Sequence, residues 1–427
     1  MYIKDLIIKK RERKELDEEE LHFFIQGYFK GEISEEQASS LVTLMCVNGI
    51  TDKEMAYLSI AMAETGEQME LYRISNKIVD IHAIGGIEDK LILILNSIMK
   101  ALKIPSAKII GRELGMTDRL DSIPGFNYKK ELSELNDFVQ KNGYVITKEP
   151  SDLAPIENKF YRLKNLTACD HYIPFIAISM MSQKIAVGAK NIVFDITCGK
   201  DAYVKDYMEA KKLSKHLVQI GKIINRNVVC VITDFFQPVG KCFGNLIEIQ
   251  EIIDCLQGKT TEDMKELILT IGQHAISLAI DNRNYKEIRN IIANTINSGE
   301  AYQSFLQIIE KQDGNVDFIN NINKSKNIVP VISTVEGYIQ GINISKIRSA
   351  AQFLGAIRKN ANDYIDPYAG IEFTKKAGDR VKKGEILAYI HTNDAPKIQD
   401  TMQILLESFE ISRRNIRNRQ RVLEIIQ

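Results

Sequence analysis

Residues 78–90 read IVDIHAIGGIEDK. The stretch begins as an apolar, β-rich run, passes through His82, turns at a glycine pair and continues toward a helix. A strand followed by a glycine-containing loop and a helix is typical of the ligand-binding edge of a parallel sheet, and such loops usually hold an anion. The side chains of Ile81 and Ile84 offer neither a charge nor a hydrogen-bond donor for that task.

Short β-rich runs alternate with helical segments over the following 160 residues. A mostly parallel sheet covered by helices follows from this alternation. The runs are KIVDIHA (77–83), SAKIIG (106–111), GYVIT (143–147), NIVFDIT (191–197) and NVVCVIT (227–233). The most apolar segment, residues 90–104, is interrupted by Asn96 and two lysines. It is too short to span a bilayer, which takes about 20 apolar residues, and is predicted to be a buried helix.

The segments before and after the alternating region differ from it. Residues 1–65 are predicted to form short helices that end at glycines, with Ser34 and Thr51 as N-caps. The apolar helix predicted over 172–189 should rejoin this bundle. The chain turns β-rich again from Val329, and its basic ending, ISRRNIRNRQRVLEII (411–426), is predicted to be a solvated helix face. The fold class is therefore α/β: a small all-α domain, a large α/β domain with a mostly parallel sheet, and a C-terminal α+β domain.

Composition excludes several kinds of partner. The 427 residues include 56 basic and 56 acidic ones, so no net charge favours nucleic acid or an anionic membrane. The first 20 residues are too charged for a signal peptide. Six scattered cysteines show no metal-binding spacing and indicate reduced thiols in a cytoplasmic protein. We expect no metal, no other cofactor, no nucleic acid and no membrane.

Seven strings, in order along nearly the whole chain, resemble the pyrimidine nucleoside phosphorylases, the family that includes thymidine phosphorylase. The strings SIPGF (122–126) and TDFFQPVG (233–240) are the most specific. The full set is IIKKRERKEL (7–16), IHAIGGIEDK (81–90), IGRELGMTDRLDSIPGF (110–126), LAPIENKFYRLKNLTA (153–168), IPFIAISMMSQKIAVGA (173–189), VITDFFQPVGKCFGN (231–245) and AGDRVKKGEILA (377–388).

The resemblance implies a homodimer that closes two domains over a pyrimidine nucleoside and phosphate. Residues 1–66 with 155–190 would form the α domain, which carries the dimer contact and binds the base. Residues 67–154 with 191–328 would form the α/β domain that binds phosphate, and 329–427 the C-terminal α+β domain.

The resemblance also implies a set of base-binding residues. His82 matches the family's loop histidine, which assists the departing base, and Tyr161 matches its tyrosine. Lys164 stands at the position of the family's arginine, Ser179 matches a serine that contacts the base, and Gln183 replaces a lysine. Lysine cannot reproduce the two-pronged hydrogen bonding of arginine, and glutamine keeps a donor and an acceptor without the charge.

The residues that hold phosphate in the family are mostly absent. Where the family has a lysine, a serine and a threonine in the loop, this chain has Ile81, Ala83 and Ile84. Gly85 and Gly86 are kept, and the next glycine is Glu88. Two further serines align with Ile92 and Ile110, and a threonine-containing stretch has shrunk to Met116 and Thr117. Dehydrating an anion without donors or charge costs several kcal/mol, so the loop is predicted not to bind phosphate in the family's manner.

Three functions remain open. The chain can be a relative without catalysis that binds a nucleoside or a partner protein, which the lost phosphate ligands favour. It can be a hydrolase in which water replaces phosphate and Glu88 is the general base. It can also be a phosphorylase whose anion site is rebuilt from Lys90, Arg112 and Arg119. A plainer interpretation has Glu88 as a solvated carboxylate or a partner of Lys90.

Overall fold

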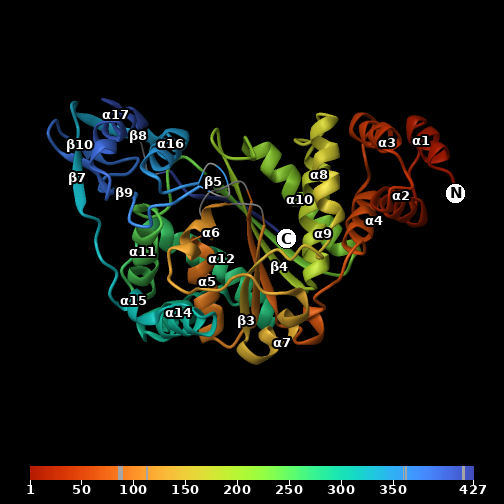
Figure 1. Ribbon diagram of the computed structural model, residues 1–427, viewed down its shortest axis with the longest axis horizontal. Helices are drawn as coiled ribbons and strands as arrows, with labels where there is room; N and C mark the ends of the chain where they lie inside the picture. Colours follow the sequence, from red (N-terminus) through yellow and green to blue (C-terminus); the bar gives the residue numbers. More distant parts are fainter. Residues whose placement is uncertain (85–89, 112–113, 359, 361–362, 416–418) are drawn as a thin grey trace.

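The first helices form a bundle on one side of the molecule (Figure 1). The computed structural model describes residues 1–84, 90–111, 114–358, 360, 363–415 and 419–427. Ser34 and Thr51 each accept a hydrogen bond from the backbone three residues on, and the residue there returns one, so both predicted N-caps are confirmed. The bundle helices are α1 (Ile3–Arg11), α2 (Glu18–Lys30), α3 (Glu35–Asn48) and α4 (Asp52–Ala63).

Two later helices complete the helical domain. α8 (Ile156–Leu166) packs on α2 and α3, and α9 (Ile173–Val187) packs on α4, as predicted for residues 172–189. α9 ends at Gly188, whose φ of 78° is left-handed and whose added Cβ would lie 2.8 Å from the Leu71 nitrogen. Only glycine fits there, so the end of α9 can lie directly against the start of η1 (Leu71–Arg73).

A six-stranded sheet lies at the centre of the molecule, in the order β13-β5-β4-β1-β2-β3. All five predicted runs are strands of this sheet and pair in parallel, whereas β13 is antiparallel. Their position between two apolar faces explains their near-complete burial. The strands are β1 (Val79–Ile84), β2 (Ser106–Ile110), β3 (Tyr144–Lys148), β4 (Asn191–Cys198), β5 (Asn227–Asp234) and β13 (Val422–Ile426).

Helices cover both faces of this sheet. On one face, α10 (Tyr207–Ile223) joins a hydrophobic cluster that continues into the helical domain. The other face carries α5 (Lys90–Ala101), which is buried over residues 90–99 as predicted. The remaining elements of this part are η1 (Leu71–Arg73), α6 (Leu114–Asp121), α7 (Leu132–Asn142), α11 (Leu246–Leu256), α12 (Glu262–Ile280), α13 (Tyr285–Asn297), α14 (Glu300–Lys311) and α15 (Val316–Asn320).

The C-terminal α+β domain contains two small antiparallel sheets, ordered β10-β8-β12 and β6-β9-β11-β7. β6 (Cys242–Gly244) comes from the α/β part, so the second sheet joins the two domains. The other elements are β7 (Asn327–Ile332), β8 (Gly337–Ile342), α16 (Ile344–Leu354), β9 (Gly370–Phe373), β10 (Arg380–Val381), β11 (Ile386–Thr392), η2 (Ala395–Lys397), α17 (Ile398–Ser408) and β12 (Phe409–Ser412). The predicted fold class is confirmed.

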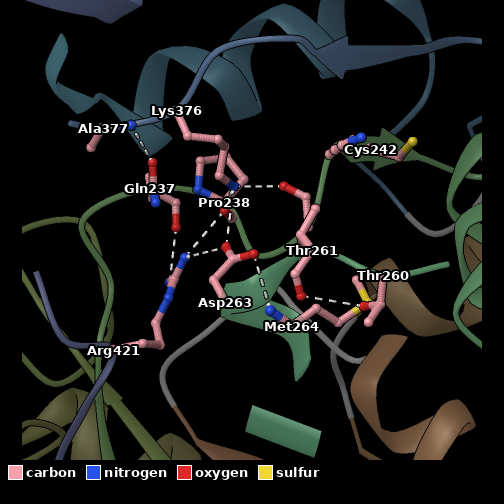
Figure 2. A network of polar contacts seen from close by, with 12 residues as sticks. Gln237, Pro238, Cys242, Thr260, Thr261, Asp263, Met264, Lys376, Ala377 and Arg421 are labelled. Carbon is pink, nitrogen blue, oxygen red and sulfur yellow. Dashed lines mark hydrogen bonds and ion pairs between the residues drawn. The ribbon is translucent and has the colours of Figure 1, made fainter. Parts of the chain in front are cut away.

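The prediction of a solvated helix at the basic C-terminus is wrong. The segment forms the end of β12 and the whole of β13, which extends the central sheet beside β5. Arg421 is 2% exposed and donates to the carbonyl oxygens of Gln237 and Pro238 and to Asp263 (Figure 2). The β-branched residues after Arg421 suit an edge strand, and tertiary hydrogen bonds bury a charge that the sequence pattern placed in water.

Two further properties of the chain concern membrane-spanning helices and the state of its cysteines. In the described ranges, no helix combines the length and the apolarity needed to cross a bilayer. The six cysteines carry free thiols, and four of them are buried. Burial raises the pKa of the Cys198 thiol to about 11, so that thiol stays protonated near neutral pH.

Candidate active site

His82 lies on β1 and points to the opposite face of the sheet from Ile81 and Ala83. Ile81 belongs to the apolar cluster around α5 and α12, and Ala83 packs against the same cluster. The ring of His82 meets Phe194 edge-on, with 6.0 Å between centroids, and Phe194 belongs to the cluster on the other face. The strand's two-residue period explains this alternation.

The imidazole of His82 is held neutral. Burial, then the positive charges of Lys184 and Lys108, lower the pKa of His82 well below its usual 6.5. Its Nδ1 is buried and finds no hydrogen-bond partner among the described residues. A neutral imidazole with an unused ring nitrogen can accept or donate a hydrogen bond to a ligand, depending on its tautomer.

Three buried charges surround His82 and were missed by sequence reasoning. Lys184 of α9 lies 2.8 Å from Asp80 of β1, and both side chains are at most 2% exposed. Burial lowers the pKa of Lys184, although Asp80 opposes that shift. Lys108 of β2 is 4% exposed and makes no hydrogen bond or ion pair with another described residue. Charged residues within strand-like apolar runs, such as Asp80 and Lys108, are the signal that could have found them.

The predicted base-binding residues lie on two neighbouring helices. Lys164 of α8 donates a hydrogen bond of 2.5 Å to Ser179 Oγ of α9. Tyr161 is one turn before Lys164 on α8, is 44% exposed, and has its ring centroid 5.9 Å from the Lys164 ammonium. Gln183, one turn beyond Ser179, donates to Glu149 Oε1 at 3.2 Å. The structure therefore brings Lys164 and Ser179 together beside Tyr161, and ties Gln183 to the end of β3.

The cations proposed for a rebuilt anion site are largely committed elsewhere. Lys90 donates to Glu251 at 2.8 Å and to the Cys242 carbonyl at 2.7 Å. Arg119 lies 2.5 Å from Glu248, and both side chains are buried. Carboxylates of α11 thus balance both charges, which weakens the rebuilt-site hypothesis.

The other predicted phosphate-side residues divide between described and undescribed parts of the chain. Gly85, Gly86, Glu88 and Arg112 lie outside the described residues. Thr117 is on α6 and is 9% exposed. The aliphatic residues that replace the family's ligands are part of the core, because Ile81, Ile84, Ile92 and Ile110 are each at most 4% exposed.

Comparison with known proteins first shows to which broad class of protein the chain belongs, a glycosyl transferase family. Two models of a glycosyl transferase family match, its helical bundle domain at residues 4–66 and its a/b domain at 75–302. Anthranilate phosphoribosyltransferase (TrpD) from Thermus thermophilus shares this fold, with a TM-score of 0.57 and 14% identity over 72% of this chain and 99% of its own.

The family follows from the C-terminal domain and from sequence relatives. A model of the pyrimidine nucleoside phosphorylase C-terminal domain matches residues 338–412. The pyrimidine-nucleoside phosphorylase of Geobacillus stearothermophilus is 37% identical over 419 residues, which cover 96% of both chains. That of Staphylococcus haemolyticus is 36% identical over 422 residues, with the same coverage. The chain belongs to the pyrimidine nucleoside phosphorylase family.

Proposed function

We propose that this protein binds a pyrimidine nucleoside between α8, α9 and β1, and that it cleaves the nucleoside with phosphate poorly or not at all. One observation carries the proposal: Lys164 and Ser179, at the positions predicted to bind the base, form a polar pair, while Ile81, Ala83 and Ile84 are packed into apolar clusters. The names of the relatives, pyrimidine-nucleoside phosphorylases, support the class of ligand.

The polar group suits a pyrimidine. A uracil or thymine ring presents two carbonyl acceptors and one N–H donor on its edge. Lys164 can donate, and Ser179 and Gln183 can each donate and accept. Tyr161, which is 44% exposed, offers an aromatic face at the entrance. A neutral base can therefore be bound with one positive charge, that of Lys164, where the family uses an arginine and a lysine.

Phosphorolysis requires the site to hold phosphate as well as the nucleoside, which binding alone does not. A phosphate oxygen must attack the anomeric carbon while the bond from that carbon to the base nitrogen breaks and the base leaves with the electron pair. The phosphate must first be stripped of water, which requires several donors or charges in return. Lys184 and Lys108 are buried cations near His82, and Lys184 is paired with Asp80. Lys108 alone replaces only part of a shell that the family builds from a lysine, serines and threonines.

The two catalytic alternatives have less support. Hydrolysis would depend on Glu88 as general base, and Glu88 lies outside the described residues. A rebuilt anion site would depend on Lys90 and Arg119, which are paired with Glu251 and Glu248.

The test combines binding with turnover. Calorimetry should show uridine or thymidine binding to the wild-type protein. Ser179→Ala should weaken that binding about ten- to 150-fold, because it removes a hydroxyl that can bind the base and that orients Lys164, and a hydrogen bond to a charged group contributes about 1.5–3 kcal/mol. Ser182→Ala is the matched control on α9, since its hydroxyl donates to the Ser179 backbone carbonyl and not to Lys164.

Release of free base, measured with and without phosphate, decides the catalytic part. The Geobacillus stearothermophilus relative serves as the positive control. Rapid phosphate-dependent release by this protein would overturn the proposal of lost phosphorolysis. Release that needs no phosphate and disappears in Glu88→Gln would establish the hydrolase instead.

A homodimer through the α domain and a cytoplasmic location also remain proposals. Exposed apolar side chains on the helical domain support the dimer: Tyr2 is 76% exposed and Val47 is 75% exposed. Sedimentation of the purified protein at the mass of one chain would contradict it.

A further inference from the structure

A pocket of about 760 Å³ lies between the α/β domain and the C-terminal domain, and its lining includes no residue of β1, α8 or α9. α11 and the segment leading into α12 form one wall, and strands β7, β9 and β11 with their flanking residues form the other. Pockets of about 300–1,000 Å³ are the usual size for sites that bind small organic molecules. The volume therefore admits a molecule as large as a nucleoside.

The lining of the pocket is amphipathic. Leu246, Ile247 and Met264 supply an apolar surface on the α/β side, and the rings of Tyr368 and Tyr389 line the C-terminal side. Aromatic and aliphatic walls of this kind bind flat, apolar ring faces.

A fixed polar group stands among these apolar residues. His391, 8% exposed, lies with its Nε2 3.1 Å from Glu372 Oε2 and its Nδ1 3.4 Å from Ser325 Oγ. The hydrogen bond from His391 is the largest cause that lowers the pKa of Glu372, so the carboxylate is ionised and orients the ring. Polar groups held in this way can read the edge of a heterocycle without rearranging.

The charges of the lining balance. Three lysines (Lys241, Lys259, Lys324) and three carboxylates (Glu251, Asp254, Glu372) line the pocket. A nucleotide phosphate or another multiply charged ligand needs an excess of one sign, which this wall does not provide.

We propose that this pocket is a second binding site, for a neutral aromatic heterocycle about the size of a nucleoside. The proposal does not depend on what the site between α8, α9 and β1 binds.

The pocket is also connected to the first residue of α5 through Glu251. Glu251, which lines it, accepts hydrogen bonds from the backbone of Lys241 and Cys242 and from the ammonium of Lys90. Lys90 is the first residue of α5. A ligand that contacts Glu251 can therefore affect the position of Lys90, which begins α5 eight residues after His82.

The experiment blocks the pocket with one side chain. Ile328→Trp should fill its mouth, because Ile328 lines the pocket and is 41% exposed on the edge strand β7. Ile332→Trp is the matched control: it lies on the same strand, is 46% exposed and is not part of the lining. Both sites are exposed, so neither change should prevent folding. Lys164→Met changes the proposed nucleoside site at α8 and α9 and so distinguishes that site from the pocket.

Adenosine, inosine, cytidine and thymidine are the probes, with binding measured by ligand-observed NMR and calorimetry. We expect at least one of them to bind the wild type, Ile332→Trp and Lys164→Met equally, and to bind Ile328→Trp at least tenfold more weakly. Amide exchange near the start of α5 should slow on binding in the same three proteins. The proposal is overturned if no probe binds Lys164→Met, or if the probe that does bind it binds Ile328→Trp as well as Ile332→Trp.

Discussion

His82 is buried as a neutral imidazole, which makes the stability of the protein depend on pH. Its pKa is lowered in the folded state, so the unfolded chain binds a proton more readily below about pH 6.5. Folding stability should therefore fall as the pH drops from 6.5 toward 5, by up to about 1.4 kcal/mol per pH unit for one such group. His82→Gln should lose this dependence, as measured by urea unfolding at several pH values.

Two other buried titratable groups, His274 and Asp195, are used as controls for this measurement. Burial lowers the pKa of His274 to about 4, so His274→Gln should change the pH dependence in the same direction. Burial raises the pKa of Asp195 to about 6, which stabilises the folded state as the pH falls and opposes the histidines. The comparison is therefore between variant and wild type at each pH. Parallel curves for His82→Gln and wild type would contradict a neutral buried His82.

Residues of the site could be predicted only where they lie in matched strings. Tyr161, Lys164, Ser179 and Gln183 were named from the family resemblance, and the structure places them on adjacent helices. Their assignment to the base remains a prediction. Lys108 was missed because a lysine in a strand is usually solvated, and its burial depends on strands and helices distant in sequence.

β1 and α9 are joined by the ion pair between Asp80 and Lys184, which links the α/β sheet to the helical domain. Removing one partner of a buried pair leaves an uncompensated charge and costs about 3–5 kcal/mol. Asp80→Asn should therefore lower the free energy of unfolding by about that amount and weaken nucleoside binding, since α9 carries Ser179. Guanidinium unfolding and calorimetry would measure both effects.

The control for this pair is on the surface. Lys346 and Glu407 lie 3.1 Å apart, but their side chains are 42% and 55% exposed. Solvent screens such a pair, so Glu407→Gln should leave stability unchanged within error. Equal, small effects of the two substitutions would show that Asp80 does not hold β1 to α9.

β1 to β5 were predicted from the sequence and β13 was not, because their surroundings differ. β1 to β5 are buried on both faces, so each reads as a continuous apolar run between turns. β13 is an edge strand that follows a run of arginines, and the basic composition of this segment favours a solvated helix face instead. The decisive contact is tertiary: β13 pairs with β5, which lies far earlier in the chain, and no local pattern reports such pairing.

Polar contacts of Arg421, near the C-terminus, join several parts of the molecule. Arg421, just before β13, donates to the carbonyls of Asp234, Gln237 and Pro238 and to Asp263. Lys376 of the C-terminal domain lies 3.3 Å from the same Asp263 carboxylate (Figure 2). Burial would raise the pKa of Asp263, but Lys376 and Arg421 outweigh it and lower that pKa. One carboxylate thus joins the central sheet, α12 and the C-terminal domain.

Arg421→Met should loosen this junction and destabilise both domains together. Three carbonyls would lose a buried donor, and the loss of such a charged network typically costs about 3–5 kcal/mol. Scanning calorimetry should show one transition at a lower temperature, because β6 and β13 make the two domains share sheets. Arg414→Met, at an exposed position, is the control. A separate early transition of the C-terminal domain in Arg421→Met would mean instead that β6 alone does not couple the domains, and that Arg421 does.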